Sequence, residues 1–140
     1  MNLQSSTLEN DEGALPLHVQ QANQIRASRE AWKAAGHRRE PWIFVSRGFF
    51  ILVDDRDRDY FGRGNRAEDS IGYIDETTRA IFGRSYAGEP DALIEALRKD
   101  EAIAEADPLL STVPKQLGVG DNADVAEPIL KLVAPPLAWS

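Results

Sequence analysis

The sequence predicts an α+β fold in which an antiparallel sheet packs against two main helices. Residues 41–55 are the densest apolar stretch of the chain, rich in the aromatic and β-branched side chains that favour strands. Residues 15–36, before this stretch, and residues 90–106, after it, carry apolar side chains at helical spacing. With 140 residues, the chain is long enough to bury a core of its own.

Residues 1–13 are polar and acidic, which predicts a disordered tail, and residues 14–140 are expected to form a single α+β domain. The first helix is expected over residues 15–36, because Gly36 fits the position just after a last helical turn. Its buried stripe is expected to comprise Val19, Ala22, Ile25, Trp32 and Ala35. The basic side chains of this helix and its exit are expected on a solvated outer face: Arg26, Arg29, Lys33, Arg38 and Arg39.

The central apolar stretch is expected to hold two strands, at residues 42–46 and 49–53. Ser46, Arg47 and Gly48 separate them, and Gly48 can adopt the positive φ of a tight turn. A bulge within one long strand is the alternative. Both faces of these strands are apolar, so we expect cover on both sides of the sheet.

Residues 54–69 are mostly charged and contain glycine, which predicts a long loop or a ragged edge strand. Residues 71–82 fit a hairpin with strands at 71–74 and 79–82. A strand followed by a helix capped by Asp75 is the alternative. The hairpin is favoured because the segment is short and its β-branched residues are poor helix formers.

The second helix is expected over residues 89–106, with Pro90 in its first turn. It could break at Lys99 and Asp100, with Asp100 capping a further turn, and Pro108 ends it.

Proline and glycine dominate the rest of the chain. Only residues 129–133 are expected to form a regular element, a short strand or a helical turn. Pro135 and Pro136 are expected to hold Leu137 and Trp139 in an extended conformation.

The net charge of −7 is concentrated near the C-terminal end, since residues 89–140 carry ten acids and four bases. A negative field disfavours nucleic acid and anionic membranes, and it favours a basic protein partner. The chain has no cysteine, no signal-peptide pattern and no apolar run long enough to span a bilayer. We therefore expect a cytoplasmic protein.

The motifs in the sequence do not indicate catalysis. Asp55, Asp57 and Asp59 alternate like the first ligands of an EF-hand, but Tyr60 and Arg66 stand where that loop needs Gly and Glu. Residues 62–67 match a dinucleotide-binding pattern without the required strand and helix, and residues 83–87 only approximate a nucleophile elbow. No catalytic residue, metal ligand or cofactor is predicted, and the chain is not expected to be an enzyme.

Residues 71–97 resemble part of the small immunity proteins that neutralise bacterial polymorphic or secreted toxins. The similarity consists of a strand, a D-x-x-T turn, a second strand and a helix, with Tyr73, Asp75 and Thr78 at the matching positions. Arg79 departs from the pattern, which usually has Gly there. The resemblance implies a non-catalytic α+β protein that occludes the active site of a toxin.

These observations predict a small acidic binding protein whose partner is a basic toxin or enzyme. The residues expected to contact the partner are Asp54, Asp55, Asp57, Asp59, Glu95, Glu101 and Glu105, with Tyr60 and Phe61 as apolar anchors. Two other functions stay open. One is a metal-assisted hydrolase that uses the acidic residues of 54–69. The other is an assembly protein or homodimer in which Leu137 and Trp139 dock into a second copy.

Overall fold

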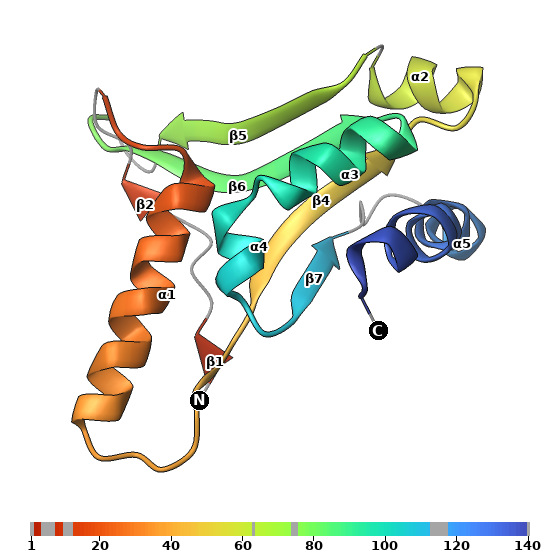
Figure 1. Cartoon of the computed structure of the whole chain (residues 1–140). Helices are drawn as coiled ribbons and strands as arrows, with labels where there is room; N and C mark the ends of the chain where they lie inside the picture. The colour runs from red at the N-terminus through yellow and green to blue at the C-terminus, as the bar shows by residue number, and fades with distance from the viewer. Residues whose placement is uncertain are drawn as a thin grey trace. The chain divides into compact units, whose positions relative to one another are not determined.

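The computed structural model describes residues 2–3, 8–9, 13–62, 64–73, 76–112 and 118–139. This part of the chain combines helices with a mixed sheet, which confirms the predicted α+β class (Figure 1). The strands are β1 (Asn2–Leu3), β2 (Leu8–Glu9), β3 (Trp42–Ile43), β4 (Val45–Ile51), β5 (Arg66–Tyr73), β6 (Arg79–Gly88) and β7 (Leu109–Thr112). The helices are α1 (Leu17–Ala34), α2 (Asp55–Phe61), α3 (Pro90–Arg98), α4 (Glu101–Glu105), α5 (Val119–Pro128), the π-helix η1 (Ile129–Val133) and the 3₁₀ helix η2 (Pro135–Leu137).

The prediction of a wholly antiparallel sheet is wrong, because β4 and β6 are parallel neighbours. The strand order is β2-β6-β4-β7, and β5 also pairs with β6. Gly48 of β4 lies opposite Ser85 of β6, whereas β2 runs antiparallel to β6. Parallel neighbours need a crossover connection. The segment that contains α2 and β5 lies between β4 and β6 in the sequence and supplies it.

The turn predicted at residues 46–48 is also wrong, because β4 passes through these residues without a break. Gly48 does not belong to the glycines with positive φ, so it does not form the predicted tight turn. Side chains alternate between buried and half-buried from Val45 to Ile51. This alternation is typical of one strand covered on both faces, as the apolar sequence predicts.

The predicted hairpin after residue 70 is confirmed, and its strands are longer than expected. β5 pairs with β6, and the two strands run in opposite directions (Figure 1). Asp75, the alternative helix cap, lies outside the described residues.

The chain divides into two compact units whose boundaries fall within β4, β5, β6 and β7 and between α3 and α4. Unit 1 comprises Met1–Ser46, Asp69–Arg84 and Asp100–Leu110. Unit 2 comprises Arg47–Glu68, Ser85–Lys99 and Ser111–Ser140. The organisation of residues 14–140 as a single domain stays a prediction.

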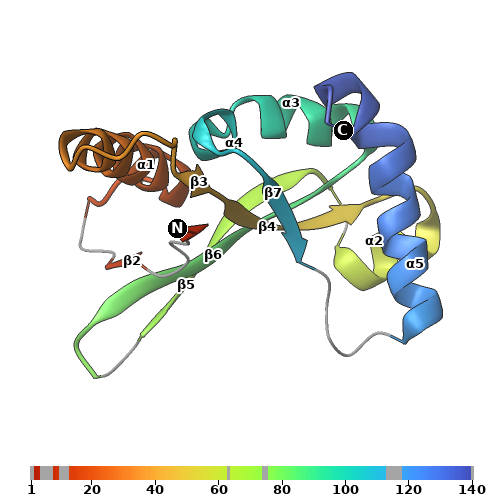
Figure 2. The same ribbon diagram turned by 90° about the horizontal axis from the view of Figure 1, so that it is seen from below.

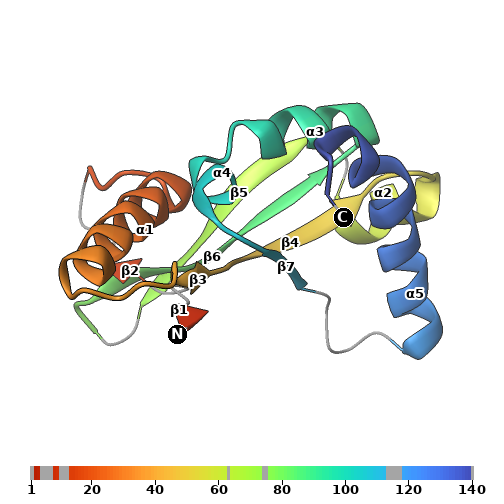
Figure 3. The same ribbon diagram turned by 60° about the horizontal axis from the view of Figure 1, so that its bottom comes forward.

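Unit 1 has a small core between α1, α4 and the start of the central strands. Ile25 of α1, Ile43, Val45 and Ala102 of α4 form its buried cluster. Helices α1 and α4 lie side by side in all three ribbon views, and most clearly in Figure 3. The buried face of α1 differs slightly from the predicted stripe, because Leu17 and Gln21 join Ala22 and Ile25 there. Val19 and Trp32 are half-buried, and Ala35 is exposed.

Two short strands lie within the predicted disordered tail. Residues 2–3 pair in parallel with β3, and residues 8–9 pair with Ile81 and Ala80 of β6. Four residues of the tail are therefore in strands. Residues 1, 4–7 and 10–12 lie outside the described part of the chain.

Unit 2 contains α2, where the sequence predicts a loop. The helix begins after Asp54, whose carboxylate accepts a hydrogen bond from the Asp57 backbone N–H at 2.9 Å. The Asp57 carboxylate in turn accepts from the Asp54 N–H at 3.3 Å. This reciprocal capping box starts the helix, and Gly62, with φ of 95°, follows its last residue. The predicted loop or edge strand is wrong for residues 55–61, because these local start and stop signals form a short helix. Residues 66–69 do lie in a strand, β5, which has one neighbour among the described strands.

The predicted second helix is divided between the two units. Helix α3 buries Leu93, Ile94 and Leu97 in unit 2. Helix α4 belongs to unit 1 and is capped by Asp100, whose carboxylate accepts from the Ile103 N–H at 3.0 Å. The sequence leaves open a break at Lys99 and Asp100, and the structure has this break.

The C-terminal part of unit 2 is more helical than predicted. Helix α5 continues directly into η1, which buries Ile129 and Val133. The extended conformation predicted after Pro135 is wrong, because η2 forms there and Ala138 adopts a left-handed φ of 55°. These turns place the Trp139 ring 6.4 Å from that of Phe49, measured between ring centroids.

Candidate functional site

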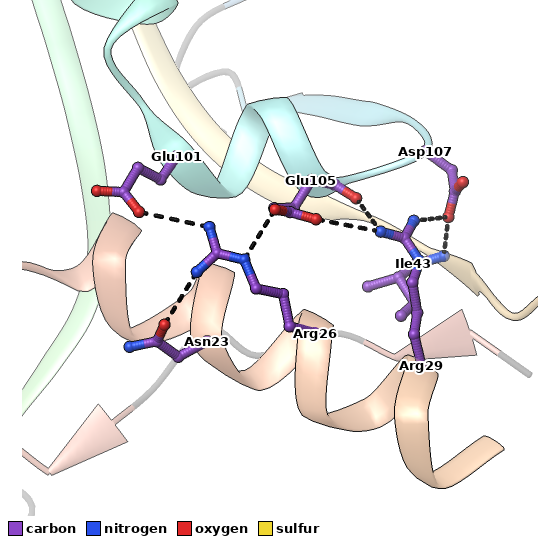
Figure 4. A network of polar contacts seen from close by, with 7 residues as sticks. All are labelled: Asn23, Arg26, Arg29, Ile43, Glu101, Glu105 and Asp107. Carbon is purple, nitrogen blue, oxygen red and sulfur yellow. Dashed lines mark hydrogen bonds and ion pairs between the residues drawn. The ribbon is translucent and has the colours of Figure 1, made fainter. Parts of the chain in front are cut away.

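Two charged surfaces contain most of the predicted contact residues, and the first is in unit 1. Arg26 and Arg29 lie one turn apart on α1 and face α4 (Figure 4). The Arg26 Nε donates to Glu105 Oε1 at 2.8 Å, and its Nη2 lies 3.5 Å from Glu101 Oε2. Its Nη1 donates to Asn23 Oδ1 at 3.1 Å. The hydrogen bond to Glu105 is the main reason why the pKa of Arg26 is raised above its ordinary value.

Arg29 extends this network to the segment after α4. Its Nη1 donates to the backbone carbonyl of Glu105 at 2.7 Å, and its Nη2 donates to Asp107 Oδ2 at 3.2 Å. The Ile43 backbone N–H donates to the same Asp107 oxygen at 2.7 Å. One network therefore joins α1, α4 and the start of the central strands (Figure 4).

The network uses side chains that the sequence assigns to the surface. Glu101 and Glu105 are predicted contact residues, but both form ion pairs with α1. Arg26 and Arg29 are predicted on a solvated outer face, but they face α4. Residues 100–110 contain four acids and no base, so part of the acidity of the C-terminal third is offset within unit 1.

Replacing Glu105 with glutamine is expected to lower the free energy of unfolding by about 1 kcal/mol, because the half-buried carboxylate pairs with two arginines. Urea unfolding measures the change. Glu30→Gln, at an exposed position of α1, is the matched control and is expected to change stability by less than about 0.5 kcal/mol. Equal stability of the two variants would show that the network is energetically neutral.

The second charged surface is α2, in unit 2. Asp54 and Asp57 form the capping box, and the Asp57 carboxylate also accepts from the Val53 N–H at 3.1 Å. Asp55 lies 3.2 Å from Arg58, but its side chain is fully exposed. Asp59 lies on the same helix and is also exposed. Four predicted contact carboxylates are therefore gathered on one short helix and its cap.

Carboxylates from other elements engage both arginines of α2. Arg58 Nη2 lies 3.1 Å from Glu89, which precedes α3, and Arg56 lies 3.9 Å from Asp124 of α5. Figure 2 shows that α2 follows the end of β4 through a short loop. The hydrogen bond to Glu89 is the main reason why the pKa of Arg58 is raised. These six carboxylates and two guanidinium groups carry a net charge of −4, and we call them the α2 acidic surface: Asp54, Asp55, Arg56, Asp57, Arg58, Asp59, Glu89 and Asp124.

The other predicted contact residues have different surroundings. The Phe61 ring stacks on Phe50 of β4 with centroids 4.7 Å apart, so it packs within unit 2. Tyr60 lies in α2, and its side chain is outside the described part. Glu95 is exposed on α3 and pairs with Arg98 at 2.8 Å. The structure thus gathers the α2 residues in unit 2, while Glu101 and Glu105 belong to unit 1.

Several exposed apolar side chains were not among the contact residues predicted from the sequence. In unit 2, Val53 is exposed beside the cap of α2. Leu130 and Leu132 are exposed on η1. Leu130 and Leu132 lie in η1, where the sequence predicts a short strand or a helical turn, but the helix α5 that leads into it was not predicted. The sequence did contain a signal for α2. Asp54 stands three residues before Asp57, which is the spacing of a capping box, and Gly62 is a typical residue at the end of a helix.

Within the described ranges, no group of three or more His, Cys, Asp or Glu side chains is arranged to hold a metal ion. The carboxylates of Asp54 and Asp57 are turned toward backbone N–H groups at the start of α2. The arrangement supplies a negative surface, and the described residues offer no chelating cluster.

The chain has an α+β fold, and unit 2 carries the α2 acidic surface. A scan against protein-family models, a search of curated proteins and a search of solved structures each found no significant match. Among the described helices, none is both long enough and apolar enough to cross a membrane.

Proposed function

We propose that this chain is a non-catalytic cytoplasmic binding protein of the immunity or inhibitor class, and that it binds a basic partner protein through the α2 acidic surface. The observation that carries this proposal is the engagement of Arg56 and Arg58 by acids of α5 and α3. Both arginines already pair with carboxylates of this surface, which keeps a net charge of −4. Such a surface attracts a basic protein and speeds its association.

Exposed apolar side chains in unit 2 support binding of a protein rather than of a small cation. Val53 immediately precedes the cap of α2 and is 51% exposed. Leu130 is 68% exposed on η1, which continues the α5 helix that carries Asp124. Protein interfaces combine apolar anchors with a charged rim, because burial of the anchors supplies affinity and the charges supply orientation.

The proposed mode of action is occlusion. The capping box fixes α2 at the end of β4, so its carboxylates are held on a short, ordered helix before the partner arrives. A preorganised acidic surface loses little conformational entropy on binding. If the partner is a toxin with a basic active site, this surface covers the groups that would otherwise contact its substrate.

The test uses the full chain and the protein encoded by the neighbouring gene, with binding measured by calorimetry at several salt concentrations. The double variant Asp55→Asn, Asp59→Asn is expected to weaken binding about tenfold and to reduce its salt dependence. Asp54 and Asp57 are left intact because they cap the helix.

The matched control is Glu30→Gln, Glu40→Gln, which removes the same charge from exposed positions of unit 1. It is expected to leave the affinity nearly unchanged. The proposal is overturned if no complex forms at micromolar concentrations, or if both double variants weaken binding equally. Inhibition of the partner's activity by one equivalent of the chain tests the occlusion step.

A further inference from the structure

Strand β5 has one strand neighbour among the described residues, namely β6. Its other edge therefore presents backbone N–H and C=O groups that no described strand pairs. Natural proteins protect such edges with charged side chains, because an open edge recruits strands from other chains. The charges of β5 are confined to its first half, at Arg66, Glu68 and Asp69. Residues 70–73 carry none.

The unprotected half of β5 also exposes apolar side chains. Asp69, Ile71 and Tyr73 alternate along the strand and therefore lie on one face of it. The side chain of Asp69 is 13% exposed, because Leu17 at the start of α1 and Arg84 bind its carboxylate. Exposure rises to 47% at Ile71 and 67% at Tyr73. The start of α1 thus covers this face at Asp69, and the cover ends before Tyr73.

We infer that the edge of β5 at residues 70–73 is a strand-addition site, and that its occupant is an extended segment of another protein with alternating apolar side chains and basic flanks. Backbone groups of the edge would pair with the segment, and Ile71 and Tyr73 would contact its apolar side chains. This site lies in unit 1, so the inference does not depend on the α2 acidic surface.

Charge favours a basic segment over a second copy of this chain. Unit 1 carries a net charge of −5, so two copies repel each other at this edge. Glu68 precedes the unprotected half of the edge and Glu76 follows it in the sequence, so acids flank the site in each copy. Like charges directly opposite each other destabilise strand pairing. Lysines at both ends of an incoming segment would instead meet these acids.

The experiment uses the full chain and a synthetic peptide in which valine and threonine alternate between terminal lysines. We expect the peptide to bind and to slow hydrogen exchange of the backbone amides in residues 70–73. The same peptide with proline in place of its central valine is expected not to bind, because proline lacks the N–H that pairing requires.

Ile71→Lys is expected to weaken peptide binding at least about tenfold, because it adds a like charge at the edge. Val119→Lys changes an exposed apolar residue of α5 in unit 2 and is the matched control with unchanged binding. Tyr73→Lys serves as a second variant if Ile71→Lys lowers the unfolding temperature. The Asp55→Asn, Asp59→Asn variant is expected to bind the peptide as the unmodified chain does. Loss of binding at the β5 edge can therefore be distinguished from loss of binding at the α2 acidic surface.

Three results would overturn the inference. The first is that neither peptide binds, and the second is that the proline peptide binds as well as its parent. The third is that the chain dimerises in sedimentation experiments and loses the dimer with Ile71→Lys, since the occupant would then be a second copy.

Discussion

Replacing Asp69 with alanine is expected to lower the free energy of unfolding by about 3 kcal/mol, because it breaks a largely buried ion pair with Arg84. The Asp69 carboxylate has two roles in unit 1. Its Oδ1 accepts from Arg84 Nη1 at 2.6 Å, and its Oδ2 accepts from the Leu17 N–H at 2.9 Å. Both ion-pair side chains are only 13% exposed, so water replaces the lost interaction poorly.

The second role of Asp69 concerns the start of α1. Pro16 precedes the helix and provides no side-chain cap, and the first turn has no acidic residue. A carboxylate from β5 therefore supplies what the local sequence lacks, since it binds an N–H group at the positive end of the helix dipole. Loss of this bond should reduce the protection of the first α1 amides from hydrogen exchange.

Glu68→Ala is the matched control for Asp69→Ala. Glu68 is the adjacent residue, its side chain is 62% exposed, and it lies 4.0 Å from Arg66. We expect its removal to cost less than about 0.5 kcal/mol. Urea unfolding of both variants, followed by circular dichroism, gives the comparison. A loss below about 1 kcal/mol for Asp69→Ala would show that the ion pair does not offset its own desolvation.

Replacing Phe49 with alanine is expected to destabilise the protein by about 3–5 kcal/mol, the range for aromatic truncations in a core. Phe49 is 2% exposed on β4. Its ring lies 6.4 Å from both Tyr86 and Trp139. The truncation removes the contact of two aromatic neighbours at once and leaves a cavity between a strand and the C-terminal turns.

The fluorescence of Trp139 reports on the packing around Phe49 in the Phe49→Ala variant. Loss of the Phe49 ring should shift the emission of Trp139 to longer wavelength, as its indole gains water. Val53→Ala, at a site 51% exposed, is the control and should cost less than about 0.5 kcal/mol. If both variants unfold at the same urea concentration, the aromatic cluster is not part of the core.

The sequence predicted elements whose signals are local and periodic. Helix α1 followed from its apolar spacing and Gly36, which has a φ of 81° after the last turn. The break before α4 followed from Asp100, which caps the helix as expected. The hairpin of β5 and β6 followed from the β-branched residues around its turn. In each case, neighbouring residues decide the conformation.

The wrong predictions are of two kinds. Some concern contacts between residues that are distant in sequence, and one concerns a capping box within a highly charged segment. Nothing within residues 42–53 indicates that β4 pairs in parallel with a strand that starts at Arg79. The charges of residues 54–59 suggested a loop, although Asp54 and Asp57 together form a capping box. The contact residues show the same limit. Glu105 resembles any surface acid in sequence, and only the fold places Arg26 against it.

The parallel pairing of β4 with β6 affects how the chain folds. Phe49 and Tyr86 lie side by side but are 37 residues apart in sequence. Closing so long a segment costs chain entropy before the paired strands contribute any stabilisation. The β5–β6 hairpin closes over only the residues between Tyr73 and Arg79, so its pairing is far less costly to begin. We therefore expect the β5–β6 hairpin to form before β4 pairs with β6.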